Sequence, residues 1–453
     1  MGQYVNWGGP DVIQWRDDRP MIKRVAMLSV HTCPLADLGG RDTGGMNVYV
    51  RELSRELTRR GVAVDVFTRQ RFAGGPRVVA DGPRVRVVHL DAGPPGPMGK
   101  ETIYEHLPEF AARVEAFRAA EDICYDRIHA HYWLSGLVGI ELRGRWRVPS
   151  LVMFHTLARV KNLHLGDGET PDSELRAHGE QRAMDAADCI VVANTAERDH
   201  IQAQYRVNVG KLAMAPLGVD THLFYPRDRA QARAALGWRD ELVVFSVGRI
   251  EPLKGMDTLV RAAGLLVKER PDWQHRLRVY IGGGQIDDDD PASGAEVAKL
   301  RALIRSLGLE EQIHLLGAVD QQELPDYYSA ADAVVVPSHY ESFGLVAVEA
   351  MACGTPVVAS RVGGLSLSVK DGETGFLVPA RDDAAFADRV GRLLESPDLV
   401  ARMGRAAAMA GKHYSWKSVA DRIVTIYDHL GPVCPRPSPQ AEHRAYATTC
   451  GCS

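Results

Sequence analysis

The sequence lacks a strong excess of charge of either sign. Its 453 residues carry a formal net charge of −4, with 25% charged and 45% hydrophobic residues. A balance so close to neutral gives no electrostatic reason to expect a nucleic acid or an anionic membrane surface as a partner. Hydrophobic runs long enough to cross a bilayer are missing too, and the amino terminus lacks the basic-then-apolar order of a signal peptide. The sequence therefore predicts a soluble, cytoplasmic protein with no membrane span.

Cysteines are few and scattered. There are seven, an odd number, and only Cys450 and Cys452 lie close together. Such a pattern argues against a disulfide framework, and a lone C-x-C on a polar tail is more typical of an unstructured end than of a metal site. A G-x-G-x-x-G motif is also missing after the first predicted strand, which argues against a dinucleotide-dependent dehydrogenase.

Strand patterns alternate with helical patterns along both halves of the chain. This alternation predicts an α/β protein with two parallel sheets. The predicted strands cover residues 24–30, 62–68, 84–90, 127–131, 150–155 and 188–194 in the first half, and 242–248, 276–282, 312–316, 333–337, 356–360 and 375–378 in the second. A segment with two prolines and a glycine, residues 215–228, separates the two series. We expect a cleft between two domains, facing the carboxyl ends of both sheets.

These patterns divide the chain into five segments. The predicted segments are an N-terminal extension (1–20), a first α/β domain (21–216), a second α/β domain (217–414), an amphipathic helix expected to cross back to the first domain (415–430), and a disordered tail (431–453). An acidic run, Asp287 to Asp290, interrupts the second domain. Four acids in a Gly-Pro context are typical of a solvated loop. We therefore expect a divalent cation to bind, if at all, only at the periphery.

Two adjacent glycines, Gly44 and Gly45, open a helix in the first half. Apolar residues then recur at helical spacing, at Met46, Tyr49, Val50, Leu53 and Leu57. The helix follows a predicted buried strand, so its amino terminus lies where ligands of parallel sheets bind and offers free N–H groups to an anion. A tight turn is the alternative explanation of the glycine pair.

The second half contains two further constellations. Glu341 and Glu349 flank Phe343-Gly344-Leu345, which opens a predicted helix. Carboxylates beside an anion-binding helix end are suited to hydroxyl groups, such as those of a ribose or a sugar. The stretch "SVGRIEPLKG" places Arg249 and Lys254 just past a strand, where two cations can offset the charge of a diphosphate leaving group. Taken singly, each of these cations is better explained as a solvated loop residue.

In this order, six motifs resemble the family 4 retaining glycosyltransferases of GT-B fold. They are the glycine loop, "VGRIEPLKG", "ESFGLVAVEA", "CGTPVVAS", "VGG" and "DGETGFLV", and the resemblance spans about residues 22 to 430. It implies two Rossmann-like domains that face a central cleft, a UDP-sugar donor held mostly by the second domain, and an acceptor held mostly by the first. The implied donor contacts are the diphosphate with Arg249, Lys254 and Gly45, the ribose with Glu349, and the transferred sugar with Glu341, the Phe343, Gly344 and Leu345 backbone, and His155.

Within that family, the first half looks most like the D-inositol-3-phosphate glycosyltransferases of mycothiol biosynthesis. The matching pieces are "SVHTCPL", "GGMNVYV", "HYWLSG", "FHTLARVKN" and "PDSELRAHGEQ". The resemblance implies an acceptor phosphate held by Lys100, Tyr132, Thr156 and Arg176, with Asn47 against the inositol ring. Residues 90–110 are also similar to sucrose-phosphate synthases, whose acceptor is fructose 6-phosphate; a glycine loop reading Gly-Gly-Met-Asn rather than Gly-Gly-Gln-Asn favours inositol phosphate.

The resulting functional prediction is a retaining hexosyltransferase that needs neither a metal nor a cofactor for catalysis. It moves N-acetylglucosamine, or glucose, from a UDP-sugar to a phosphorylated polyol such as 1D-myo-inositol 3-phosphate. Transfer of glucose to fructose 6-phosphate is one alternative. A non-catalytic sugar-nucleotide-binding protein is another, although the presence of both glutamates and both cations argues against it. The expected partners are these small molecules, and a second copy of the chain is the one macromolecular partner left open.

Overall fold

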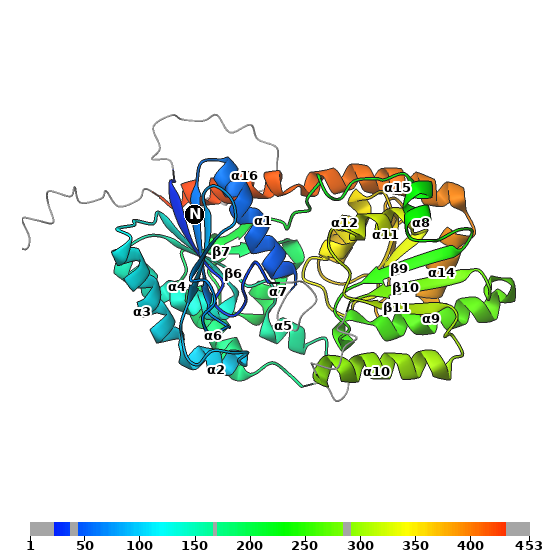
Figure 1. Ribbon diagram of the computed structural model, residues 1–453, viewed down its shortest axis with the longest axis horizontal. Helices are drawn as coiled ribbons and strands as arrows, with labels where there is room; N and C mark the ends of the chain where they lie inside the picture. The colour runs from blue at the N-terminus through cyan, green and yellow to red at the C-terminus, as the bar shows by residue number, and fades with distance from the viewer. Residues whose placement is uncertain (1–21, 37–43, 166–169, 284–290, 432–453) are drawn as a thin grey trace, which may run out of the picture.

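A computed structural model describes residues 22–36, 44–165, 170–283 and 291–431. The predictions made for the N-terminal extension, the acidic run at Asp287 to Asp290, the tail from 432 and the pair Cys450 and Cys452 lie outside the described residues. Figure 1 shows two lobes side by side, one built on each half of the chain. Among the described helices, none combines the length and the apolar character that crossing a bilayer requires.

The first lobe is built on an eight-stranded sheet with the order β3-β4-β2-β1-β5-β6-β7-β8. Its strands are β1 (Arg24–Leu28), β2 (Ala63–Arg69), β3 (Val78–Ala80), β4 (Val85–Leu90), β5 (Arg127–His131), β6 (Ser150–Met153), β7 (Cys189–Val192) and β8 (Leu212–Met214). Its helices are α1 (Gly45–Arg59), α2 (Lys100–Glu105), α3 (Leu107–Ala120), α4 (Tyr132–Trp146), α5 (Ala158–Asn162), α6 (Glu174–Ala186) and α7 (Thr195–Gln204). All neighbours pair in parallel except β3 with β4.

The second lobe is built on a parallel six-stranded sheet with the order β11-β10-β9-β12-β13-β14. Its strands are β9 (Leu242–Val247), β10 (Leu277–Gly282), β11 (Ile313–Gly317), β12 (Ala333–Val336), β13 (Val357–Ser360) and β14 (Gly375–Val378). Its helices are α8 (Arg229–Ala235), α9 (Met256–Glu269), α10 (Pro291–Ser306), α11 (Leu324–Ala330), α12 (Leu345–Ala352), α13 (Leu365–Ser368), α14 (Asp383–Leu394) and α15 (Pro397–Gly411). The predicted α/β class with two parallel sheets is therefore confirmed.

Each of the twelve predicted strands is present, with ends that differ by at most two residues. The prediction missed β3 and β8, which lie at the two edges of the first sheet. Both are three residues long, and edge strands are commonly that short. A run of three residues is too short to show a strand period, which explains why sequence patterns do not find them.

The chain passes between the lobes twice. The first crossing is the segment 215–228, which contains our proposed domain boundary at 216 and 217. The second leads from α15 into α16 (Trp416–His429), the last described helix, which packs against α1 on the first lobe (Figure 1). The crossings touch where the Val219 N–H donates to the Tyr414 carbonyl at 2.6 Å. The lobes are therefore joined by two adjacent segments.

Candidate functional site

A cleft of about 420 Å³ lies between the lobes, at the carboxyl ends of both sheets. All fourteen site residues predicted from the sequence line it. From the first lobe they are Gly45, Asn47, Lys100, Tyr132, His155, Thr156 and Arg176, and from the second Arg249, Lys254, Glu341, Phe343, Gly344, Leu345 and Glu349. Ligands of parallel α/β sheets bind at this edge, because the loops that leave the strands converge there. The fold thus brings residues that are 304 positions apart, Gly45 and Glu349, to one cavity.

Residues 341–344, which we call the cleft loop, lead from β12 into α12. Gly344 has a φ of 88°, and a Cβ there would lie 2.4 Å from Leu365 Cδ2. Gly363 has a φ of 41°, and a Cβ on it would lie 2.0 Å from the Glu341 carbonyl oxygen. Only glycine satisfies both the left-handed backbone and the close approach. The "VGG" stretch is therefore the support against which the cleft loop packs.

The amino terminus of α12 opens into the cleft. The first backbone N–H groups of a helix have no acceptor within it, and those of Leu345 and Val346 occupy these positions. Their partial positive charge favours an anion at this point. The helix thus opens at the predicted Phe343-Gly344-Leu345 stretch, and contact of this backbone with a ligand stays a prediction.

Lys254 and Glu341 form an ion pair across the second lobe's side of the cleft. Lys254 Nζ lies 2.6 Å from Glu341 Oε2, and the two side chains are 23% and 16% exposed. Arg249, predicted as the second cation, pairs with Glu251 at 3.0 Å. In this structure the ammonium group of Lys254 is thus partnered by a carboxylate that was predicted to bind sugar. An incoming diphosphate would compete with Glu341 for the same cation.

Glu349 is a buried carboxylate on the first turns of α12. It is 8% exposed and accepts a hydrogen bond from the Tyr328 hydroxyl at 2.9 Å. Burial raises the pKa of Glu349 to about 7, and the Tyr328 bond opposes part of this rise. Its carboxylate is therefore half-protonated near neutral pH, and a hydrogen-bonding ligand that prefers the charged form would lower its pKa.

Arg176, on α6, is the most constrained of the predicted acceptor residues. Its Nε donates to Glu180 at 2.8 Å, and Nη1 pairs with Asp172 at 3.0 Å. Nη2 donates to both the carbonyl and the hydroxyl oxygen of Thr156, at 2.9 and 3.0 Å. The guanidinium also lies over the ring of Tyr132, 4.8 Å from its centroid. Two carboxylates thus hold Arg176 in place and offset its charge.

Tyr132 and His155 leave neighbouring strands with backbones in the left-handed region. Their φ values are 75° and 62°, which few residues other than glycine adopt without cost. Strain of this kind often marks positions where a side chain must be presented in one direction. His155 Nε2 bonds to His131 Nδ1 at 3.0 Å, and burial lowers the pKa of His155 to about 3. His155 is therefore a neutral imidazole near pH 7.

Asn47 borders the cleft, but its side-chain amide is bonded within the protein. It is 1% exposed, and its Nδ2 donates to Thr32 Oγ1 at 2.8 Å and to the Cys33 carbonyl at 2.7 Å. Its Oδ1 accepts the Gly44 N–H at 3.0 Å. Both ends of the amide therefore fix the glycine loop at the start of α1. An acceptor contact by Asn47, as predicted, would require one of these bonds to be exchanged.

Several residues that line or support the cleft were missed by sequence reasoning. They are Asp172 and Glu180 beside Arg176, Tyr328 beside Glu349, His131 beside His155, and Asn194 and Glu197 at the start of α7. Arg176 and Glu180 are four residues apart on α6, so helical periodicity could have revealed this pair. The others are brought together by the fold alone.

Both halves of the chain match glycosyltransferase families. Residues 228–409 match the family described as "Glycosyl transferases group 1", and residues 44–218 match the "Glycosyl transferase 4-like domain". A sucrose-phosphate synthase from Thermosynechococcus elongatus superposes with a TM-score of 0.83 at 36% identity, covering 90% of this chain and 99% of the other. The fold and the cleft thus define a glycosyltransferase of GT-B fold.

Curated relatives narrow this class. A D-inositol 3-phosphate glycosyltransferase from Saccharomonospora viridis is 43% identical over 410 residues, covering 89% of this chain and 94% of the relative. One from Kineococcus radiotolerans is 43% identical over 419 residues, covering 90% and 95%. The chain belongs to the family of these glycosyltransferases. At 22% identity, the Anabaena protein HepE in complex with UDP and glucose shares the fold, with a TM-score of 0.68 and coverage of 90% of this chain and all of the other.

Proposed function

We propose that this enzyme transfers a sugar, with N-acetylglucosamine favoured, from a UDP-sugar to a phosphorylated polyol of the inositol phosphate type, with retention of configuration. The observation that carries the proposal is the division of the cleft into two unlike halves. The second lobe supplies an open helix start, two cations and a buried carboxylate. The first lobe supplies Lys100, Tyr132, Thr156 and Arg176 around one part of the wall.

The second lobe is suited to a nucleotide sugar. A helix amino terminus and the cations of Arg249 and Lys254 favour a diphosphate, and Glu349 can accept two hydroxyl hydrogen bonds once ionised. Structures of this fold have been determined with UDP, UDP-glucose or UDP-2-fluoro glucose, which supports UDP as the nucleotide of the donor. N-acetylglucosamine as the donor sugar rests on the resemblance to inositol phosphate enzymes.

The proposed reaction proceeds on one face of the sugar. The bond from the anomeric carbon to the diphosphate oxygen breaks, and a bond from that carbon to the acceptor hydroxyl oxygen forms on the same side. The acceptor proton passes to the departing diphosphate oxygen, so no side chain has to act as the base. Lys254, Arg249 and the start of α12 offset the charge that develops on the leaving group.

A second candidate is glucose transfer to fructose 6-phosphate. It is favoured by the 36% identity and the TM-score of 0.83 with the cyanobacterial sucrose-phosphate synthase. Both acceptors are phosphomonoesters, so the cations of the first lobe suit either. The two candidates differ in the ring that the cleft must accommodate beside the phosphate.

The deciding experiment measures UDP release from UDP-N-acetylglucosamine and UDP-glucose, each with inositol 3-phosphate or fructose 6-phosphate, in the presence of EDTA. Release with inositol phosphate alone supports the proposal, and release with fructose 6-phosphate alone supports the second candidate. The variant Lys100→Ala tests the residues assigned to the acceptor. We expect it to raise the acceptor KM by about tenfold and to spare UDP release to water, because we assign Lys100, which lines the cleft from the first lobe, to the acceptor phosphate.

A further inference from the structure

Asn194 bridges the two lobes through its side-chain amide. It precedes α7 on the first lobe, and its Nδ2 donates to the Ser342 carbonyl, in the cleft loop of the second lobe, at 2.7 Å. Its Oδ1 accepts the N–H of Glu197, three residues further on, at 2.9 Å and so caps α7. Asn194 is 7% exposed. Helix capping needs only the oxygen, so the nitrogen is available for a second purpose.

The start of α7 is a rigid base for this contact. Glu197 Oε2 accepts the N–H of Ala193, the residue before the cap, at 2.6 Å, so Glu197 and Asn194 hold the start of α7 by two bonds. The Glu197 carboxylate is buried, and burial raises its pKa to about 7. Because its backbone is held on both sides, Asn194 directs its amide to one point in the cleft.

The other end of the contact lies among the proposed donor residues. Ser342 stands between Glu341, which pairs with Lys254, and Phe343. On the side of its own lobe, the Gly364 N–H donates to the Glu341 carbonyl at 3.0 Å, and a Cβ on Gly364 would lie 2.4 Å from Phe343 Cα. The cleft loop is thus held between the glycine pair of its own lobe and an amide of the other.

We propose that Asn194 is a positioning residue that fixes the cleft loop from the opposite lobe when the cleft is closed. The inference rests on the proposed function, since the cleft loop is the segment assigned to the transferred sugar. Neighbouring contacts close the lobes on the same side: Arg381 Nη2 donates to the His164 carbonyl at 3.2 Å, and the rings of His164 and Tyr340 are 5.1 Å apart. Asn194 is the member of this group that touches the cleft loop itself.

Two substitutions remove the contact of Asn194 with the cleft loop and keep the cap of α7. Asn194→Asp and Asn194→Ser both keep an oxygen that caps α7, but neither can donate to the Ser342 carbonyl as the amide does. We expect each to lower kcat by about tenfold while the Kd for UDP stays within about threefold, because the nucleotide contacts come from the second lobe. Asn208→Asp is the control, since Asn208 caps the turn at Val209–Lys211 through its Oδ1 at an exposed position.

Small-angle scattering of the full chain gives a readout independent of turnover. With UDP bound, we expect both Asn194 variants to have a larger radius of gyration than the wild type and the Asn208 variant. Loss of activity in Asn194→Asp but not in Asn194→Ser would assign the effect to the added charge and overturn the proposal. Wild-type kinetics in both variants would overturn it as well. A wild type that is inactive with every donor and acceptor would refute the proposed function but not the role of Asn194. Scattering without UDP would then decide: a larger radius of gyration in both Asn194 variants supports that role, and an unchanged radius refutes it.

Discussion

Glu349 shows how the cleft combines burial with charge. Its carboxylate is nearly removed from water and is stabilised by a tyrosine hydroxyl rather than by a cation. The pKa therefore rises from the ordinary 4.5 to about 7. The folded protein binds this proton more tightly than the unfolded chain does. Protonation of Glu349 therefore stabilises the folded state. This contribution to the free energy of unfolding is fully present below pH 4.5 and is lost as the pH rises to about 7.

Replacing Glu349 by Gln should remove this dependence on pH. Gln keeps an oxygen for Tyr328 but cannot ionise. The free energy of unfolding of Glu349→Gln, minus that of the wild type, should therefore rise by about 2 kcal/mol between pH 5 and pH 8. Urea denaturation at both pH values measures the difference. Glu373→Gln, at an exposed position, is the control. A difference between Glu349→Gln and wild type that stays constant with pH would show that Glu349 ionises normally.

Lys254 is expected to act on the leaving group. Lys254→Ala should lower kcat by about 100-fold and leave the acceptor KM within about twofold, because we assign the lost charge to the diphosphate and not to the acceptor. Initial rates with both substrates varied test this. Lys268→Ala, an exposed lysine on α9, should match the wild type. A Lys254 variant with normal turnover would remove this residue from the proposed mechanism.

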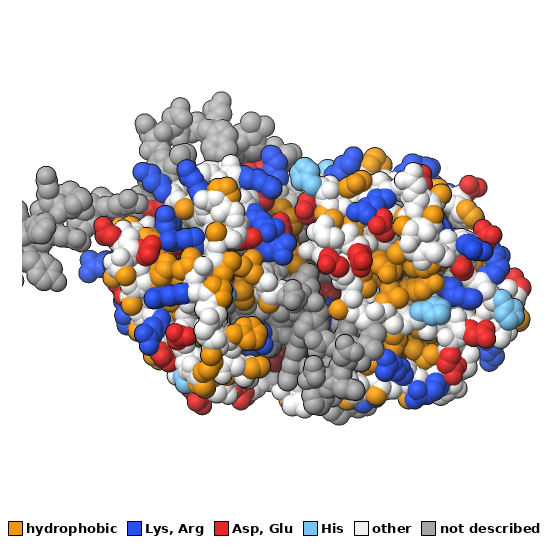
Figure 2. Space-filling model, viewed as in Figure 1, with side chains coloured by type: hydrophobic (Ala, Val, Ile, Leu, Met, Phe, Trp, Pro, Cys, Tyr) orange, Lys and Arg blue, Asp and Glu red, His pale blue; other side chains and the backbone are white. Residues whose placement is uncertain are grey.

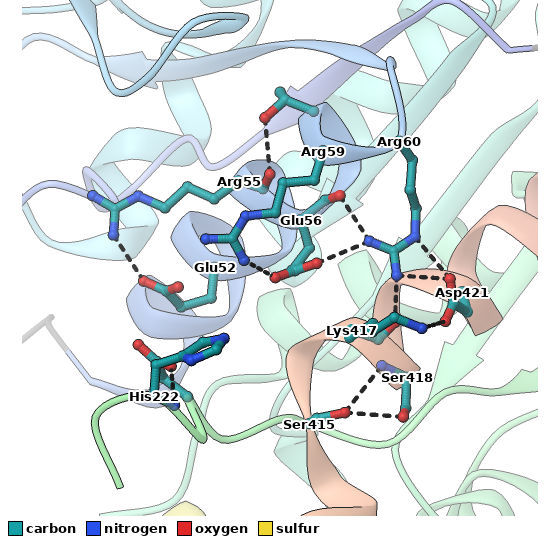
Figure 3. Close-up of polar contacts among 12 residues, drawn as sticks. Glu52, Arg55, Glu56, Arg59, Arg60, His222, Ser415, Lys417, Ser418 and Asp421 are labelled. Atoms are coloured by element: carbon teal, nitrogen blue, oxygen red, sulfur yellow. Dashed lines mark hydrogen bonds and ion pairs between the residues drawn. The ribbon is translucent and has the colours of Figure 1, made fainter.

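At the scale of elements, α16 is held to the first lobe by a buried arginine. Arg127, on β5, is 2% exposed and donates to the Tyr427 carbonyl at 3.0 and 2.7 Å and to the Gly431 carbonyl at 2.8 Å. The Tyr427 carbonyl also accepts the Leu430 N–H at 3.3 Å, so Arg127 adds charged donors at the end of α16 and at Gly431 just beyond it. Figure 3 shows a second tie nearer the surface, in which Arg60, the residue after α1, contacts Glu56, Asp421 and the Lys417 carbonyl.

Arg127→Met should destabilise the protein far more than Arg60→Met. The first substitution removes the charged donors of the buried Tyr427 carbonyl and of the Gly431 carbonyl, which costs about 3 kcal/mol. The second breaks the ion pairs of Arg60 with Glu56 and with the 54% exposed Asp421 at the surface, and should cost about 1 kcal/mol or less. Thermal or urea unfolding of the two variants gives the comparison. Equal effects would mean that the carbonyls at the end of α16 find water when Arg127 is removed.

Sequence patterns were sufficient for the elements and insufficient for their contacts. Buried parallel strands are apolar runs, which is why β1 and β9 were found, whereas β3 and β8 are too short to show a period. Eight of the fourteen site residues came from local patterns, whereas the five acceptor residues and His155 came from the family resemblance, and the fold brings all of them together. The Asn194 contact was invisible, because its acceptor is a backbone carbonyl that every residue possesses.

Over the whole molecule, the starts of α1 and α12 face each other across the cleft. A Cβ on Gly45 would lie 3.1 Å from Leu345 Cδ1. Figure 2 shows side chains of both charges interspersed over the visible face of the two lobes, so no broad electrostatic repulsion between them is seen there. Steric fit at the two helix starts is therefore expected to limit how closely the lobes approach.

A graded series at Gly45 tests this limit. Gly45→Ala should change kcat by less than about twofold, because the end of the Leu345 side chain can move by a few tenths of an ångström. Gly45→Val adds branched bulk and should lower kcat by about tenfold, with a more open particle in solution scattering. A Val variant as active and as compact as the wild type would show that the helix starts do not approach this closely in the working enzyme.

The return of α16 to the first lobe also orders events during synthesis. The strands of that lobe leave the ribosome first, but the carbonyls that Arg127 binds lie in the last described turn of the chain. Domains usually fold as they emerge, N-terminal first. Here the earlier lobe stays incomplete until the later one has been made, so a chain interrupted after α15 would carry an intact second lobe beside a first lobe with an unfilled surface.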